Sequence, residues 1–439
     1  MKKYFKYSLL FAAVCVLSVG FTSCKDDDED GPDLGAQDTE IKAITNEYLN
    51  SVVYPTYTNL ANETESLFGK ISALKTKLKA GTTVQQSEID AICTSYKTAR
   101  KHWEESEAFL YGAASDFEID PHIDTWPLDV PTLAADLADD AKIARLDAAD
   151  GIDYARTNLT AENLGFHGLE FIFFRNGKNR DVAIFNNDVT EDDANFAGKN
   201  VTGKEEVIFA TAVAGDLRDK CFQLEVAWNP NASAAHKSRV AECAKTSDDF
   251  ETKVAKNGLT YGEDLAAIES GNSSIGTSWK KVLETILVSG CSNICAEVAD
   301  QKMGQAYRAA TSSTPTYHEG EDGGQEQDDP NYIESPYSHN SFTDFYGNII
   351  SIQNSLYNNL GGSSAISSSL MSYLTKYNPD MARELDAKLK VALQALVACQ
   401  NSRVAFVDAP GAPYVKTAMD AIGQLDEALN EAADWILKN

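Results

Sequence analysis

Basic residues are scarce in this chain. Its 439 residues include 38 Lys and Arg against 66 Asp and Glu, which gives a formal net charge of −28 at pH 7. A surface of this sign repels the phosphate backbone of nucleic acids and attracts cations. The composition therefore predicts that nucleic acid is not a partner.

Three motifs that mark common catalytic scaffolds are missing as well. The sequence has no His-Glu-x-x-His zinc-peptidase motif, no Gly-x-Ser-x-Gly elbow and no Walker-type phosphate loop. It contains only six histidines. A serine or cysteine nucleophile paired with one of these histidines stays open, but no motif points to one.

Long stretches of alternating apolar and polar residues, which predict β-strands, are also absent. Apolar residues instead recur at steps of three and four, which places them in one stripe along a helix. This spacing holds at Ile41, Ile44, Tyr48 and Val52; at Leu67, Ile71, Leu74 and Leu78; at Ile89, Ile92, Tyr96 and Trp103; and at Ile422, Leu425, Leu429, Ala432 and Ile436. Asn378-Pro379-Asp380 predicts a helix start, with a side-chain cap, proline at the first position and an acid near the positive end of the dipole.

These patterns predict an all-α protein made of two helical-bundle domains. A chain of 439 residues with 43% hydrophobic content is long enough for two cores. Turn-forming residues between Trp228 and Tyr261 punctuate the helices, so we expect an N-terminal bundle over residues 38–255 and a C-terminal bundle over residues 256–439. The Asn-, Asp- and Gly-rich stretch 176–203 and the acidic stretch 312–336 are predicted to be solvated loops.

The N-terminus predicts export. Residues 1–24 combine three early lysines, a short apolar stretch and small residues before Cys24, which is typical of a signal peptide. A cysteine at this place resembles a bacterial lipobox, so we expect Cys24 to be lipidated; an ordinary signal peptide cut near Ser23 is the alternative. Residues 25–37 begin with a run of acids, which predicts a flexible tether and resembles the surface-export signal of Bacteroidetes lipoproteins. We therefore expect a lipid anchor in the outer membrane, on the cell surface.

Six cysteines follow the signal peptide, at positions 93, 221, 243, 291, 295 and 399. Six thiols allow 15 pairings, and the sequence does not select one. Cys291 and Cys295 lie one helical turn apart, which is poor geometry for a local disulfide. Buried free thiols, or disulfides to other helices, are the favoured interpretations.

The hexapeptide from Gly165 to Glu170 is the strongest chemical signal. His167 and Glu170 are three positions apart, so they share one face of a helix, and the apolar run 171–174 that follows predicts that this face is buried. A buried imidazole and carboxylate must satisfy each other or bind a ligand, and this pair of residue types favours a metal. The alternatives are therefore a metal site, for which other segments must supply ligands, and a structural His–Glu hydrogen bond.

Two further clusters carry polar residues near apolar ones. The first runs from Trp103 to Asp129, and its Glu107 and Asp124 are candidate additional metal ligands, although acids near helix ends often only cap or solvate. The second contains Ser338, Asp344 and Asn348. Positions 344, 348, 351 and 355 share one helical face, which predicts either the lining of an interface or cleft or a solvent-facing side.

Taken together, these segments resemble the imelysin family, which is also known as the insulin-cleaving membrane peptidase or iron-regulated protein A-like family. The family signature Gly-x-His-x-x-Glu is matched by Gly165, His167 and Glu170, and its Ile-Asp-x-Trp-Pro segment by residues 123–127, which include Trp126. Its downstream Glu-Ser-x-Tyr-Ser…Asp-Phe…Asn-Ile pattern is matched by residues 334–338, 344–345 and 348–349. The resemblance implies two helical bundles with the signature near their interface, a link to bacterial iron uptake and a metal at the His and Glu.

Three hypotheses of function follow. The first is a surface lipoprotein that binds iron, another divalent metal, haem or an iron-bearing protein without catalysis. The second is a metal-dependent peptidase with Glu170 as a catalytic residue; the family is classed with peptidases, but only two credible ligands are visible here, whereas such enzymes usually have three and a general base. The third is a scaffold for a partner protein in which the His–Glu pair is structural.

Overall fold

The computed structural model describes residues 35–187, 190–191, 193–320 and 323–439. Residues 1–24, including Cys24, lie outside the described residues, as do residues 25–34 of the 25–37 segment. The signal peptide, the lipid anchor and the outer-membrane location therefore stay predictions.

The described part of the chain confirms the all-α fold, because long helices form its framework. Its first half contains α1 (Ala36–Tyr48), the π-helical turn η1 (Leu49–Val53), α2 (Tyr54–Lys79), α3 (Gln86–Glu104), η2 (Glu107–Phe109), α4 (Ala113–Asp116), α5 (Ile119–Ile123), α6 (Val130–Leu137), α7 (Asp140–Leu146), α8 (Gly151–Asn158), η3 (Ala161–Asn163), α9 (Gly165–Phe173), α10 (Val182–Asn186), η4 (Ala194–Phe196), α11 (Gly203–Trp228) and α12 (Ala234–Cys243). One short hairpin, β1 (Phe174–Arg175) with β2 (Lys178–Asn179), follows α9.

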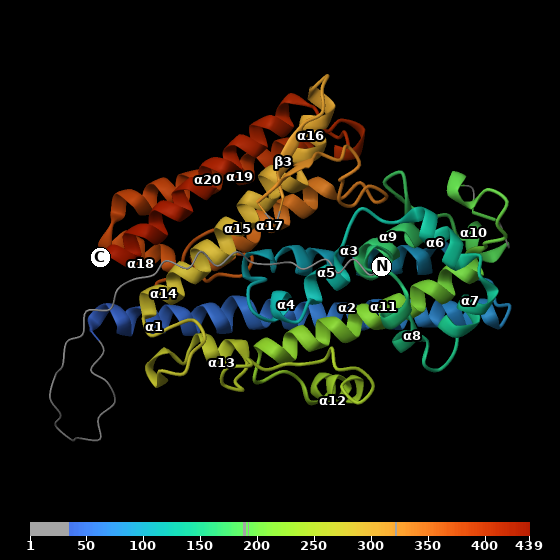
Figure 1. Cartoon of the computed structure of the whole chain (residues 1–439), viewed down its shortest axis with the longest axis horizontal. Coiled ribbons are helices and arrows are strands. Elements are labelled where there is room, and N and C mark those ends of the chain that lie inside the picture. The colour runs from blue at the N-terminus through green and yellow to red at the C-terminus, as the bar shows by residue number, and fades with distance from the viewer. Residues whose placement is uncertain (1–34, 188–189, 192, 321–322) are drawn as a thin grey trace.

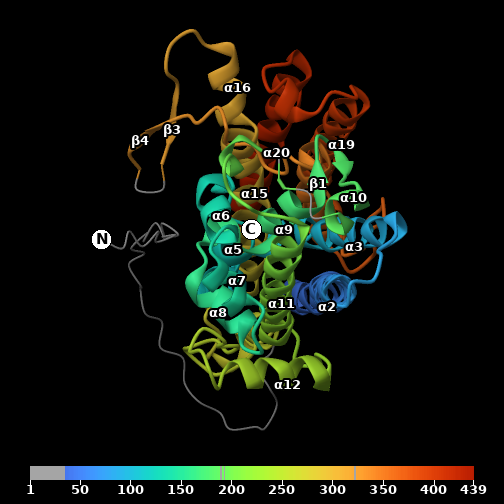
Figure 2. The ribbon, with the colours of Figure 1, turned by 90° about the vertical axis from the view of Figure 1, so that its right-hand side faces the viewer.

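The second half continues with shorter helices and ends in a long helical hairpin. It contains α13 (Tyr261–Leu265), η5 (Ile268–Ser270), α14 (Trp279–Glu284), η6 (Thr285–Ser292), α15 (Asn293–Ala296), η7 (Glu297–Lys302), α16 (Gly304–Thr311), α17 (Ser341–Tyr357), α18 (Leu370–Tyr377), α19 (Pro379–Asn401), η8 (Phe406–Asp408) and α20 (Pro413–Lys438). A second hairpin, β3 (Tyr317–Glu319) with β4 (Gln325–Gln327), lies beside α16 and stands off from the helices (Figure 2).

The helices form two packed groups. In Figure 1, α1 and α2 form one long rod with α11 beside α2, and α3 also packs on α2. The other group is built on the antiparallel pair α19 and α20, against which η6 packs. Helix α17 contacts α3 and η2 of the first group and α19 of the second, so it joins them. The boundary predicted between residues 255 and 256 remains a prediction.

Several local predictions can be compared with the structure. Helix α19 begins at Pro379, and the Asn378 side chain caps it by accepting a hydrogen bond from the backbone N–H of Met381, as expected. The six cysteines after the signal peptide are free and buried. The interpretation of residues 312–336 as a solvated loop is wrong at its end: Ile333, Glu334 and Ser335 are buried. Stretch 176–203 contains β2, α10 and η4.

One helical rod among the described residues, Trp279–Thr311, is long and apolar enough to cross a membrane by length and composition. Its apolar window is 61% buried inside the protein, which is typical of a core helix. The rod includes the π-helical segments η6 and η7, and η7 carries Lys302 to the site described next.

Candidate metal site

Two glycines set the position of helix α9. Gly165 has a φ of +58°, a conformation that favours glycine, and a Cβ there would collide with the carbonyl oxygen of Ile123. A Cβ on Gly168 would collide with the carbonyl oxygen of Asn163. Because Gly165 lacks a side chain, the start of α9 lies directly against the end of α5, and this brings His167 next to Asp124. Gly168 allows η3 the same close approach to α9.

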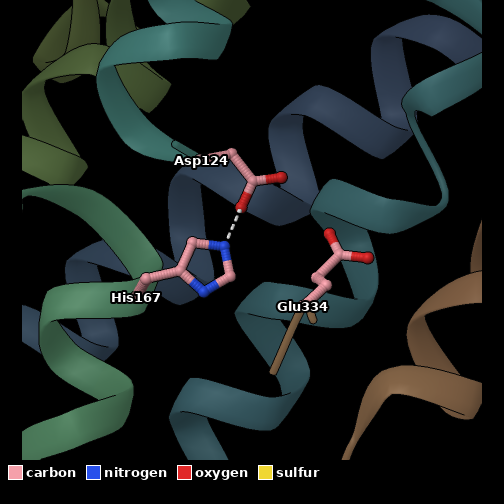
Figure 3. Close-up of side chains that lie close together, drawn as sticks. All are labelled: Asp124, His167 and Glu334. Atoms are coloured by element: carbon pink, nitrogen blue, oxygen red, sulfur yellow. Dashed lines mark ion pairs between the residues drawn. The ribbon is translucent and has the colours of Figure 1, made fainter. Parts of the chain in front are cut away.

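His167 lies between two carboxylates. Its Nε2 is 3.1 Å from Asp124 Oδ1 (Figure 3), and its Nδ1 is 3.8 Å from Glu170 Oε2. The second distance is too long for a hydrogen bond, so the His167–Glu170 hydrogen bond of the structural interpretation is not formed. Burial lowers the pKa of His167, but the interactions with Asp124 and Glu170 outweigh burial and raise the pKa to about 9.

Glu170 holds one segment of the chain with one oxygen and leaves the other free. Its Oε1 accepts hydrogen bonds from Tyr337 N at 3.1 Å, Ser338 N at 2.7 Å and Ser338 Oγ at 2.6 Å. Its Oε2 is buried and accepts no hydrogen bond. The clasped segment is flanked by Ser335 and His339, which have positive φ values of 52° and 56°, a conformation that non-glycine residues adopt only where the surroundings enforce it.

Arg100 of α3 is the centre of a buried ion network beside His167. Its side chain is fully buried and contacts four carboxylates: Glu104 at 2.6 Å, Asp124, Glu334 at 2.6 Å and Asp344 at 3.6 Å. Burial lowers the pKa of Arg100, but these four groups outweigh burial and hold the pKa well above its ordinary value. The network fixes Asp124 and Glu334 in place next to the imidazole.

Lys302 is the second buried cation. Its Nζ lies 3.2 Å from Glu334, 3.7 Å from Glu297 and 3.8 Å from Glu107. Burial raises the pKa of Glu107 well above its ordinary value, and Lys302 offsets only part of this effect. The structure therefore places Glu107, predicted from sequence as an additional ligand, beside Lys302 rather than on the cavity wall that holds His167.

Carboxylates outnumber cations in this part of the protein. Six buried carboxylates meet Arg100, Lys302 and His167: Glu104, Glu107, Asp124, Glu170, Glu334 and Asp344. Such an excess of buried negative charge must be neutralised by protons or by a bound cation. Two sets of three side chains each bring one donor atom apiece within 4.8 Å of the others: Asp124, His167 and Glu334 (Figure 3), and Glu104, Glu107 and Asp124.

A cavity of about 380 Å³ reaches His167 and Glu170 from the surface. Its wall includes the exposed Asn176 and Asn331, so it opens to solvent. The complete lining is Trp126, Pro127, Leu128, His167, Glu170, Asn176, Asn331, Ile333, Pro336, Tyr337, His339, Val407 and Asp408. The cavity thus combines an apolar and aromatic wall with two imidazoles and two carboxylates, those of Glu170 and Asp408.

The other residues named from sequence lie around this site in supporting positions. Ser338 binds Glu170, and Trp126 lines the cavity. Asp344 accepts hydrogen bonds from Ser335 and Asn340, and Asn348 donates to Glu104 Oε2 at 2.6 Å. The polar face of α17 therefore lines a buried interface and does not face solvent.

Sequence reasoning missed three members of the site. Arg100 lies in the apolar stripe of α3, four residues after Tyr96 and three before Trp103, and a charge inside such a stripe was the signal. Lys302 offered no local signal, because its partners Glu107 and Glu334 are remote in sequence. His339 followed a matched segment but was assigned no role.

The residues on the cavity wall fit a transition metal. Imidazole nitrogen and carboxylate oxygen are ligands of zinc and iron at about 2.0–2.2 Å, so two donors of one ion lie about 3–4 Å apart. The 3.8 Å between His167 Nδ1 and Glu170 Oε2 falls in this range. Glu170 Oε2 is buried and accepts no hydrogen bond, and His167 Nδ1 forms a 3.8 Å ion pair with it, so a metal ion that displaces the proton of the imidazole could bind both atoms.

Comparison with known proteins identifies relatives that are similar over most of the chain. The chain is 23% identical over 392 residues to the iron-regulated protein A of Synechococcus elongatus, covering 88% of this chain and 85% of that protein. A crystal structure of an iron-regulated protein A precursor from Parabacteroides distasonis matches with a TM-score of 0.66 and 20% identity, over 93% of this chain and 97% of that one. An imelysin-like protein from Psychrobacter arcticum matches with a TM-score of 0.48 and 13% identity. The family model described as imelysin matches residues 53–432, and the chain belongs to the imelysin family.

Proposed function

We propose that this protein binds a divalent metal ion, iron foremost, in the cavity beside α9 and serves bacterial iron uptake without catalysis. The observation that carries the proposal is the pair His167 Nδ1 and Glu170 Oε2, two donor atoms 3.8 Å apart on one cavity wall, of which Glu170 Oε2 is buried and accepts no hydrogen bond. The excess of buried carboxylates behind them favours a cation. The similarity to iron-regulated protein A supports iron as that cation.

Binding is favoured over peptide cleavage because the carboxylates nearest His167 are already engaged. A metallopeptidase needs an open metal position and a base that can take a proton from water. Asp124 and Glu334 are each held by Arg100, and Glu170 Oε1 is occupied by three hydrogen bonds. A metal-dependent peptidase therefore remains the second hypothesis, and haem or an iron-bearing protein remains an alternative ligand.

We also propose that the protein works on the outer surface of the outer membrane, anchored through Cys24. The support is the sequence alone: a signal peptide that ends in cysteine, followed by an acidic stretch. An anchor of this kind would keep the cavity close to the membrane across which iron must pass. Metabolic labelling with a clickable fatty acid tests it: label is expected in the wild type and absent in Cys24→Ala.

Metal content and metal affinity of the purified protein test the binding proposal. Two variants each remove one of the proposed metal-binding atoms. His167→Ala removes the imidazole. Glu170→Gln replaces Oε2 with an NH₂ group, while its amide oxygen can still accept hydrogen bonds from Tyr337 and Ser338. His102→Ala is a matched control, because His102 is on α3 and is not on the cavity wall.

We expect one tightly bound Fe²⁺ or Zn²⁺ per chain in the wild type and in His102→Ala, and none in the other two variants. Wild-type protein that binds no metal in anaerobic titrations would contradict the proposal and favour the scaffold hypothesis. Chelator-sensitive cleavage of peptides that is lost in Glu170→Gln would favour the peptidase hypothesis instead.

A further inference from the structure

We infer that Asp124 is the positioning residue of the metal site: it keeps the proton of the His167 imidazole on Nε2, so that Nδ1 is the nitrogen that binds the metal. This inference rests on the proposed function and gives Asp124 a role other than that of a metal ligand, for which the sequence made it a candidate. It starts from the two nitrogens of the ring, which face different groups. Nε2 lies 3.1 Å from Asp124 Oδ1, whereas Nδ1 lies 3.8 Å from Glu170 Oε2 (Figure 3 shows the first contact).

Asp124 is held by donors on both of its oxygens. Trp103 Nε1 donates a hydrogen bond to Oδ2 at 2.7 Å, and the guanidinium of Arg100 binds Oδ1. An indole N–H and a guanidinium can only donate, so Asp124 meets them as an ionised carboxylate. All three side chains are buried, with exposed fractions of 3% or less. The carboxylate therefore has a fixed place and a fixed charge before any metal binds.

The charge of Asp124 decides which nitrogen of His167 keeps its proton. A neutral imidazole has one N–H donor and one nitrogen with a lone pair. At 3.1 Å from the Asp124 carboxylate, a lone pair on Nε2 would face negative charge, whereas an N–H is attracted to it. The proton therefore stays on Nε2, and the lone pair on Nδ1 is left for the metal. A carboxylate that contacts the second nitrogen of a metal-binding imidazole recurs in metalloproteins.

Arg100 disfavours a metal on the Nε2 side of the ring. Asp124, His167 and Glu334 each bring one donor atom within 4.8 Å of the others, so their spacing alone would allow them to surround an ion. Arg100, however, is fully buried and contacts both of these carboxylates. A divalent ion among the three would lie beside the guanidinium, and two buried cations repel each other strongly. The geometry thus leaves the Nδ1 side, with the unbonded Glu170 Oε2, to the metal.

The backbone sets the distance between Asp124 and His167. Asp124 directly follows α5, and the carbonyl of Ile123, the last residue of α5, lies against Gly165, the first residue of α9. The ring of Trp126 packs beside the imidazole, with 5.9 Å between the ring centroids. The carboxylate at one edge and the indole beside the ring therefore hold the imidazole in one orientation.

The metal affinity of Asp124→Asn tests the inference. The amide has the shape of the carboxylate but no charge, and its NH₂ group can donate to Nε2, which would move the imidazole proton to Nδ1. We expect Fe²⁺ still to bind under anaerobic conditions, with an affinity about 10- to 100-fold weaker than that of the wild type. Glu225→Gln is the matched control, because Glu225 pairs with the buried His236 and neither lies on the cavity wall; it is expected to keep wild-type affinity. Melting without metal reports whether each variant folds.

Nitrogen-15 NMR of histidine-labelled protein loaded with Zn²⁺ reads the tautomer directly and requires no variant of Asp124. We expect His167, whose signals are identified by their loss in His167→Ala, to carry its proton on Nε2 and to bind Zn²⁺ through Nδ1. Zn²⁺ bound through Nε2, or wild-type affinity in a folded Asp124→Asn, would overturn the role of Asp124 while leaving metal binding, the proposed function, intact. A wild type that binds neither Fe²⁺ nor Zn²⁺ would overturn both.

Discussion

Two buried charge networks in this protein differ in how their charges are matched. In the network of α8, α11 and α12, Arg156 binds Asp216 at 2.7 Å and Asp219 at 3.0 Å, and Arg218 and Arg239 also bind Asp219. Every buried side-chain nitrogen and oxygen of these three arginines and two aspartates has a hydrogen-bond partner among the described residues. In the network around Arg100, by contrast, buried atoms of Glu104, Glu107, Glu170 and Glu334 accept no hydrogen bond.

The difference separates a structural network from a candidate ligand site. Arginines and aspartates in near-equal number satisfy one another, and the result holds helices together. Where carboxylates are in excess, Glu170 on the cavity wall keeps a buried oxygen without a hydrogen bond, which a cation in the cavity can use. Burial alone therefore does not indicate function in this fold; unmatched charge beside a cavity does.

Replacing the central arginine should destabilise the protein more in the network around Arg100 than in the network around Arg156. Arg100→Met leaves four carboxylates without their shared partner, and we expect a loss of about 3–5 kcal/mol in the free energy of unfolding. Arg156→Met should lose less, about 1–3 kcal/mol, because Asp219 keeps Arg218 and Arg239 and Asp216 keeps His122. Denaturant unfolding measures both, and equal losses would erase the distinction.

Metal should stabilise the protein through one network only. At a free metal concentration 100 times Kd, binding to the folded state adds about 2.7 kcal/mol to the free energy of unfolding of the wild type. Glu170→Gln should lose this gain, whereas Asp216→Asn should keep it, because Asp216 lies in the matched network. Thermal melts with and without Fe²⁺ or Zn²⁺ provide the measurement, and a gain retained by Glu170→Gln would place the metal elsewhere.

Loosening the segment that Glu170 holds should have a smaller effect. Ser338→Ala removes the hydroxyl donor to Glu170 Oε1 and leaves the two backbone N–H donors. We expect a loss of about 1–2 kcal/mol in the free energy of unfolding, as for one hydrogen bond to a buried charge. Ser341→Ala is the control, because it removes a hydroxyl that donates to a neutral backbone carbonyl, that of Glu334. Chemical denaturation of both variants compares the loss of a contact with a carboxylate with the loss of a contact with a carbonyl. An equal loss in both variants would argue that the contact with Glu170 stabilises the fold no more than a hydrogen bond to a neutral carbonyl.

The two networks should also respond to pH with opposite signs. Asp120 lies in α5, four residues before Asp124, at the edge of the network around Arg100. Burial and the carboxylates of Glu297 and Asp124 raise the pKa of Asp120 from 3.8 to about 8. The folded state then binds more protons than the unfolded state between these values, so stability falls as pH rises from 4 to 8. Burial raises the pKa of Asp216, but His122 and Arg156 outweigh it and hold the pKa below 3.8, so its contribution is lost only as pH falls through that lower pKa.

Unfolding curves at several pH values test this contrast. Asp120→Asn is expected to flatten the decline in stability between pH 4 and pH 8, and Asp216→Asn to leave that decline unchanged. A decline that persists undiminished in Asp120→Asn would show that this carboxyl is ionised in the folded protein at neutral pH.

The helices and half of the site could be predicted from sequence because their signals are local. The spacing of Ile422, Leu425 and Leu429 reports a buried stripe within one helix, and His167 and Glu170 share a turn of α9. Asp124 was a candidate on the strength of its neighbourhood and the family resemblance, and the structure brings it to His167.

The remaining members depend on long-range packing, which no local spacing reports. Glu334 and Lys302 meet Arg100 and Glu107 because α17, which follows Glu334, packs on α3 and η2, and because η6 and α15, which precede η7, pack on η2. The same packing buries the end of the 312–336 stretch, whose acidic composition predicted exposure. His339 joins the cavity because the β1–β2 turn and Glu170 fix the segment that carries it.

The most direct test of the central claim is anomalous diffraction from a crystal of the protein soaked anaerobically in Fe²⁺ and measured at the iron edge. We expect one strong peak on the cavity wall, within bonding distance of His167 Nδ1 and Glu170 Oε2. A peak enclosed by Glu104, Glu107 and Asp124, or no peak near His167, would contradict the assignment of the cavity as the metal site.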